Sequence, residues 1–229
     1  MHTGTDHSGE TGDPSGGLSS ALDSVKSLVS IVMGLALTHT IITVVAAAGN
    51  ADTAQAPSSS LGGTLSLSEI PLQSALCALA LITAIVRFYH GNNRFLDLAY
   101  GESAEDRKGG AFGGGIGGNF IVIMVQSVFF ALMSFYVDGS RELVLLFGVL
   151  LLLDIFWYVA NLKTTDTDPV ALDTQRKWMI NNLSFLAVLV VLYSIKNEDV
   201  AVTAAAAAIL ANTLVDFRIS WKTYFPSYS

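Results

Sequence analysis

Six long apolar stretches dominate this sequence of 229 residues. Each is about 17–21 residues long, and a helix needs roughly 20 residues to cross the hydrocarbon core of a bilayer. Charged residues make up only 14% of the chain, against roughly 25% in typical soluble domains. The pattern predicts an all-α, polytopic membrane protein. Its six transmembrane helices would lie at residues 28–48, 70–88, 120–137, 143–159, 178–195 and 200–217.

The basic residues divide unevenly between the two sets of segments that flank six alternating spans. Only Arg141 and Lys196 fall in one set. The other set holds Lys26, Arg87, Arg94, Arg107, Lys108, Lys163, Arg176, Lys177, Arg218 and Lys222. Because basic residues near helix ends are retained in the cytoplasm, both termini are predicted to be cytoplasmic. We expect a multi-pass protein of the plasma (inner) membrane.

The connections between spans predict three sequential helical hairpins within a membrane domain at residues 23–225. Only residues 138–142 separate the third span from the fourth, and residues 196–199 separate the fifth from the sixth. Such short loops join antiparallel neighbours. The dipeptide Asp168-Pro169 is typical of a helix start, and it predicts that the fifth helix begins before its apolar part.

Two segments are expected to lie outside the helices. Residues 1–22 form an acidic, Gly- and Ser-rich tail with too little apolar surface to fold, so we expect it to be disordered. Residues 89–119 are read as a Gly-rich cytoplasmic loop, with seven glycines at 109–118. Its formal match to GxGxxG lacks the strand and βαβ unit of a nucleotide site. The run HGNNR at 90–94 is interpreted as an interfacial turn.

Polar residues inside the spans are the main functional evidence, because such groups are costly in lipid and usually face a partner or a cavity. The charged and amide residues among them fall in the predicted cytoplasmic half, whereas the run Thr38-His39-Thr40, with Thr43 one turn on, lies in the otherwise apolar outer half. We therefore expect a polar vestibule open to the cytoplasm, an apolar barrier beyond it, and one titratable histidine near the outer side. The candidate pathway residues are His39, Arg87, Gln126, Asp154, Asn161, Asn212 and Asp216.

Asp154 is the strongest of these candidates, because it lies below the midplane of its span. It shares one helix stripe with Trp157 and Asn161, spaced i, i+3 and i+7. Asn212 and Asp216 share another stripe at i, i+4, and Asp216 is expected near water at the inner interface.

A structural interpretation stands beside the functional one. The polar groups would then form interhelical hydrogen bonds and a pair between Arg87 and an aspartate. Such bonds contribute only about 0.6 kcal/mol each on average. His39 would be a packed histidine bonded to a backbone carbonyl or a neighbouring hydroxyl.

Several kinds of chemistry have no support in the sequence. The chain lacks HExxH, GxSxG and the P-loop Gly-Lys-Ser/Thr, which disfavours an enzyme of those classes. The single cysteine, Cys77, excludes an intrachain disulfide, and no cluster of residues has metal-ligand spacing. We expect no metal, no cofactor and, with a net charge of −7, no nucleic-acid partner.

The sequence favours a channel or transporter for an ion or small solute. The alternative is a membrane-embedded sensor or effector that acts through a cytoplasmic protein partner, as the Gly-rich loop and the acidic tail suggest. The bilayer is the expected partner in both cases, and a homo-oligomer is compatible with either.

Topology is directly testable with reporter fusions. Reporters that are active only outside the cytoplasm should be active in the loop at 49–69 and silent at residue 110 and at the C-terminus. The reason is the uneven division of the basic residues. Activity at residue 110 or at the C-terminus would overturn the predicted orientation.

Overall fold

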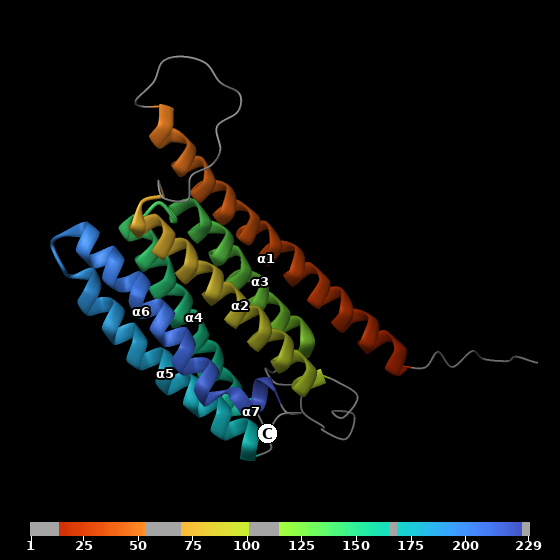
Figure 1. The fold of residues 1–229 in the computed structure, drawn as a ribbon. Coiled ribbons are helices and arrows are strands. Elements are labelled where there is room, and N and C mark those ends of the chain that lie inside the picture. The colour runs from red at the N-terminus through yellow and green to blue at the C-terminus, as the bar shows by residue number, and fades with distance from the viewer. Residues whose placement is uncertain (1–13, 54–69, 101–114, 165–168, 226–229) are drawn as a thin grey trace, which may run out of the picture.

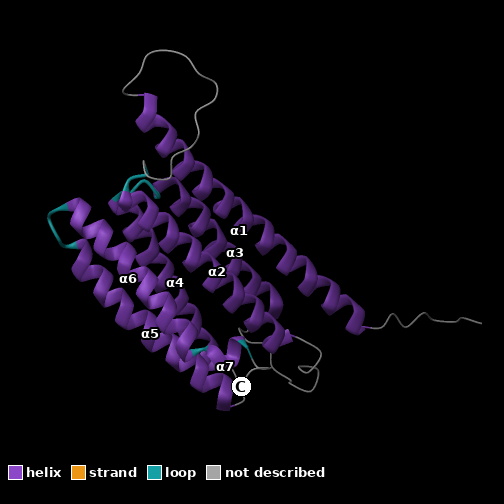
Figure 2. Cartoon of the chain, viewed as in Figure 1, coloured by secondary structure: helices purple, strands orange, loops and turns teal. Residues whose placement is uncertain are grey.

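The computed structural model describes residues 14–53, 70–100, 115–164 and 169–225, and the secondary structure of these residues is entirely helical (Figures 1 and 2). The long helices are α1 (Pro14–Thr53), α2 (Leu72–Tyr100), α3 (Gly115–Met133), α4 (Arg141–Thr164), α5 (Pro169–Tyr193) and α6 (Glu198–Ile219). A 3-10 turn, η3 (Ser134–Tyr136), follows α3, and a four-residue helix, α7 (Trp221–Tyr224), ends the described chain.

Five of these helices are long and apolar enough to cross a membrane, which confirms the predicted class. The segments are Ser20–Ala46, Leu72–Asp97, Gly117–Tyr136, Arg141–Ala160 and Glu198–Ile219. The remaining long helix, α5, begins at Pro169 as predicted and carries Arg176, Lys177 and two asparagines in its first half. These polar residues lower its mean hydropathy, although its second half is apolar.

The six long helices pack side by side, and α2 contacts more of the other helices than most of them do. α2 packs against α1, α3, α6 and α7, and α4 packs against α3, α5 and α6. α1 packs mainly on α2, α3 and η3, and it runs along the outside of the bundle and projects beyond it (Figure 1). Exposed apolar side chains such as Ile31, Leu35 and Ile42 suit a lipid-facing helix.

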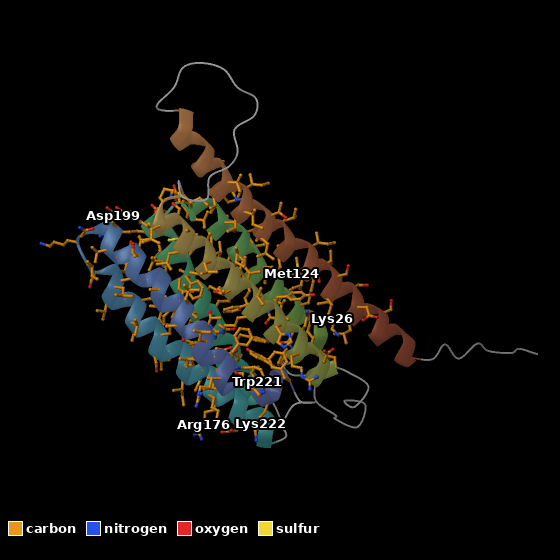
Figure 3. The ribbon with its side chains drawn as sticks, viewed as in Figure 1. Lys26, Met124, Arg176, Asp199, Trp221 and Lys222 are labelled. Atoms are coloured by element: carbon orange, nitrogen blue, oxygen red, sulfur yellow. The ribbon has the colours of Figure 1, made fainter. Side chains whose placement is uncertain are left out.

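The bundle has two distinct ends. At one end, which we call the α7 end, α2 ends, α3 begins and α7 packs against α2 and α6 (Figure 1). Figure 3 shows Arg176 and Lys222 at this end and Asp199 at the opposite one, here the hairpin end. Two short connections, α3–η3–α4 and α5–α6, lie at the hairpin end.

Side chains satisfy the open backbone groups at the hairpin end. Arg141 Nη2 donates to the carbonyl oxygens of Ile195 at 2.6 Å and Lys196 at 2.9 Å. A cation is favourable there, because the C-terminus of a helix carries a partial negative charge. Asn197 caps α6 by accepting a hydrogen bond from the backbone N–H of Val200 at 3.1 Å. These contacts fix the two hairpins against each other.

The predicted boundaries of the tail and the Gly-rich loop are wrong in part. α1 begins at Pro14, so only residues 1–13 of the proposed disordered tail lie outside the described residues. α2 continues to Tyr100 and α3 begins at Gly115, which leaves residues 101–114 of the proposed loop outside them. The expected turn at 90–94 is helical, because Asn92 bonds Gln126 and Gly91 packs closely against Tyr224.

The turn before α4 provides a stability test. Gly139 has φ +111°, and a Cβ at this position would lie 2.7 Å from Nε2 of Gln73. Gly139→Ala should therefore lower the free energy of unfolding by about 1–3 kcal/mol. Thermal unfolding in detergent measures the loss. Gly148→Ala in α4 is the control, because its Cβ would meet only Leu186 at 3.8 Å. An equal effect of the two changes would contradict the assigned strain.

Candidate functional site in a buried polar network

Polar side chains from α2 to α7 meet inside the bundle in one buried network. Burying such groups is unfavourable unless hydrogen bonds replace those to water. All its members are at most 5% exposed, so their partners have to come from one another. The polar network consists of Arg87, Asn92, Gln126, Asp154, Asn182, Asp216 and Tyr224.

The strongest contact in the polar network is an ion pair between α2 and α6. Arg87 Nε lies 2.9 Å from Asp216 Oδ2, and Arg87 Nη2 donates to Asp216 Oδ1 at 3.1 Å. Two parallel contacts of this kind hold a guanidinium and a carboxylate in one fixed geometry. The expectation that Asp216 lies near water is wrong, because Asp216 is 0% exposed.

Asp154 is held differently, by neutral amides. It accepts hydrogen bonds from Gln126 Nε2 at 2.9 Å and from Nδ2 of Asn182. Asn182 in turn accepts from Arg87 Nη2 at 2.9 Å, and Gln126 accepts from Asn92 Nδ2 at 3.0 Å. Within the described residues Asp154 forms no ion pair. A continuous chain of hydrogen bonds nevertheless links it to the guanidinium through one amide.

An aromatic layer closes the polar network towards the α7 end. Trp157 follows Asp154 by one turn of α4, and Trp178 precedes Asn182 by one turn of α5. Neighbouring ring centroids in this layer lie 4.7–6.0 Å apart. We call it the aromatic collar, and it consists of Phe95, Trp157, Tyr158, Trp178 and Tyr224.

The helix α7 supplies Tyr224, which belongs to both the polar network and the aromatic collar. Tyr224 donates its hydroxyl to Asp216 Oδ2 at 2.8 Å, and Trp178 Nε1 donates to Ser220 Oγ just before α7. Burial and the nearby Asp216 carboxylate raise the pKa of the Tyr224 phenol, so Tyr224 remains a donor at neutral pH. The C-terminal segment is therefore bonded directly into the polar network.

A small cavity lies between the polar network and the aromatic collar. Its volume is about 20 Å³, which is room for about one water molecule. Arg87, Asp154 and Asp216 line it together with the aromatic collar. Among the described residues, Nη1 of Arg87 is buried and has no hydrogen-bond partner. The cavity therefore combines one unused cationic donor with two carboxylates.

On its other side the polar network meets an apolar layer. Towards the hairpin end, α3 to α6 fill the bundle with buried apolar side chains, among them Phe130, Phe147, Leu150, Phe185 and Ile209. The apolar layer lies where an apolar barrier was expected, and its role as a barrier stays a prediction. The polar side chains of the network are buried and hydrogen-bonded to one another, so they do not line an open vestibule in the described conformation.

Two of the candidate pathway residues, His39 and Asn212, lie apart from the polar network. His39 Nδ1 is 3.2 Å from the carbonyl oxygen of Ser134 and 3.1 Å from its Oγ, which is the packed arrangement of the structural interpretation. Asn212 is buried one turn from Asp216, and its Nδ2 has no partner among the described residues. Asn161 belongs to α4, but its side chain lies outside the described residues.

Sequence reasoning missed three members of the polar network. Asn182 is one of two adjacent asparagines in the fifth span, and periodicity alone does not show which faces inwards. Asn92 was placed in a turn, although the stretch around it contains no proline. Tyr224 lies beyond the last span and gives no local signal.

Comparisons of the chain with protein-family models, curated proteins and solved structures found no match. The described residues contain no group of three or more His, Cys, Asp or Glu side chains that could hold a metal ion. A function for this protein therefore has to be inferred from the polar network itself.

The ion pair should dominate the stability of the bundle. Asp216→Asn removes the carboxylate that Arg87 contacts directly, which should cost about 3–5 kcal/mol and lower the unfolding temperature in detergent. The control is Asp173→Asn, which breaks an exposed pair with Lys177 and should cost about 0.3–0.5 kcal/mol. Similar losses for the two variants would show that the buried pair has no special weight.

Proposed function

We propose that the protein is an integral membrane channel or transporter for an ion or small solute. The observation that supports this most is Asp154, a carboxylate buried in a membrane-type helical bundle without an ion-pair partner among the described residues. An acid of this kind is costly in lipid and typically marks an ion or proton pathway. A purely structural polar cluster would gain little, since interhelical hydrogen bonds in membranes average about 0.6 kcal/mol.

The proposed topology has six spans in three sequential hairpins. α5 is the sixth span in this proposal, because it packs along both α4 and α6 and its second half is apolar. The α7 end faces the cytoplasm and carries both termini, in agreement with the basic residues at that end, such as Arg176 and Lys222 (Figure 3). We place the protein in the plasma (inner) membrane on the same argument.

The arrangement of layers favours a transporter over a permanently open channel. The aromatic collar lies on one side of the polar network and the apolar layer on the other, and both consist of buried side chains. In this proposal the two layers open alternately. A solute or ion reaches Asp154 through one layer while the other layer is closed. In this proposal the described conformation is a closed one.

The second candidate is a membrane sensor that acts through a cytoplasmic partner. Its support is the direct bond between α7 and the polar network, which links Asp216 to the end of the described chain through Tyr224. The long α1, which projects beyond the bundle, would offer a surface for such a partner or for a second copy (Figure 1). A sensor would respond to the polar network without passing solute.

Flux through liposomes tests the proposal. Vesicles containing the purified full chain are loaded with an indicator dye selective for H⁺, Na⁺ or K⁺, and a gradient of the matching ion is applied in each case. The parent should carry at least one of them, and Asp154→Asn should reduce that flux about tenfold or more while the protein stays folded, because the charge is lost and the shape is kept. Asp173→Asn, which changes only an exposed surface pair, should leave the flux unchanged.

Two outcomes would speak against this function. If Asp154→Asn is as stable and as active as the parent, Asp154 is not on the pathway. If the folded parent carries none of the three ions and no tested small solute, the sensor becomes the better proposal.

A further inference from the structure

The charges of the polar network do not cancel. It contains one guanidinium, Arg87, and two carboxylates, Asp154 and Asp216. The groups that face Asp154 from α3 and α5 are the neutral amides of Gln126 and Asn182. The other titratable groups that line the same cavity as Asp154, besides Arg87 and Asp216, are the phenols of Tyr158 on α4 and Tyr224 on α7. With both carboxylates ionised, the polar network would carry one uncompensated negative charge.

The position of Arg87 decides which carboxylate lacks compensation. Both contacts of the ion pair go to Asp216, and Asp154 receives only amide hydrogens. An isolated ionised carboxylate in a low-dielectric interior is strongly disfavoured, and such a group takes up a proton or a cation. Asp154 is therefore the carboxylate at which the additional positive charge has to bind.

The cavity beside Asp154 favours a proton over a metal cation. Its volume of about 20 Å³ is close to that needed by one water molecule. Arg87 lines the cavity, and its Nη1 has no partner among the described residues, so a metal ion there would face a second positive charge. Hard metal cations such as Ca²⁺ and Mg²⁺ are also bound by about six or more oxygen ligands in proteins. Of the five residues of the aromatic collar that line the cavity, only Tyr158 and Tyr224 carry a side-chain oxygen.

We propose that Asp154 reversibly binds one proton and that Arg87 exchanges partners with its protonation. The proposal rests on the transport function above and names the proton as the transported or coupled species. When a proton binds, the Asp154 carboxylate becomes a neutral carboxylic acid, and its new O–H can donate to a water molecule in the cavity. When that proton leaves to water, the carboxylate regains its negative charge and competes with Asp216 for Arg87.

The contacts provide a route for this exchange. Asn182 already bridges Arg87 Nη2 and Asp154 Oδ2, and the unused Nη1 of Arg87 is available to a second acceptor. If Arg87 moves towards Asp154, it leaves Asp216, whose other partner is the Tyr224 hydroxyl. Loss of the proton at Asp154 is thereby coupled to the position of α7 and to the aromatic collar.

Infrared difference spectroscopy tests the proton site without a gradient. The full chain in lipid vesicles is titrated from acid to alkaline pH. We expect a carbonyl stretch of a protonated carboxylic acid that disappears as pH rises and shifts in D₂O. The band should be absent from Asp154→Asn, retained at a changed frequency in Asp154→Glu, and unchanged in Asp173→Asn.

A second variant tests the charge count. Asp216→Asn leaves one carboxylate for one guanidinium, so the Asp154 band should disappear at a pH lower by about one unit or more. If this variant does not fold, Asp154→Asn and Asp154→Glu still decide the assignment, because each changes the band without removing the ion pair.

Three results would overturn the proton site. The first is a parent spectrum without a titrating carboxylic band. The second is a band that persists in Asp154→Asn. The third is loss of the band on addition of Na⁺ or K⁺ at constant pH, which would assign a metal cation to the site. A titrating band without any flux would leave the proton site intact and remove the transport function, and flux without the band would do the reverse.

Discussion

The buried guanidinium of Arg87 is the constraint on which the rest of the bundle depends. An arginine keeps its charge in a protein, so Arg87, which is 4% exposed, needs acceptors from the helices around it. Asp216 on α6 supplies two and Asn182 on α5 supplies one. These contacts fix the rotation of three helices relative to one another. Since Asp216 also accepts from Tyr224, the position of α7 follows from the same requirement.

The layering of the bundle is a consequence of this polar level. Buried hydrogen-bonding side chains have to contact one another, so they gather at one level of the bundle. The helix segments on either side of that level can then pack through apolar and aromatic side chains. Towards the hairpin end the interior is apolar, with Phe147 and Phe185 in edge-to-face contact at 6.1 Å. Towards the α7 end the stacked rings of the aromatic collar fill the interior. Each layer separates the polar network from bulk water with buried side chains, which strengthens its electrostatic interactions and raises the cost of an unpaired charge.

The parts of this structure that depend on local composition could be predicted from sequence, and the parts that depend on distant contacts could not. Hydropathy identified the apolar helices, and the cost of polar groups in lipid identified Arg87, Gln126, Asp154 and Asp216, which do meet. The region at 90–94 was misread because its residues favour turns, whereas the bond from Asn92 to Gln126 keeps it helical. His39 and Tyr224 show the same limit, since periodicity gives a face of a helix but not the partner that covers it.

The two amides beside Asp154 explain why its charge state would be felt beyond α4. An amide donates and accepts at once, so Gln126 and Asn182 each join Asp154 to a residue on α2. Those residues, Asn92 and Arg87, lie more than one turn apart on the same helix. A change at Asp154 therefore acts on α2 at two points and would tilt or turn it rather than move one side chain. Because α2 also packs against α1, α3, α6 and α7, it is the element best placed to pass that change to both ends of the bundle.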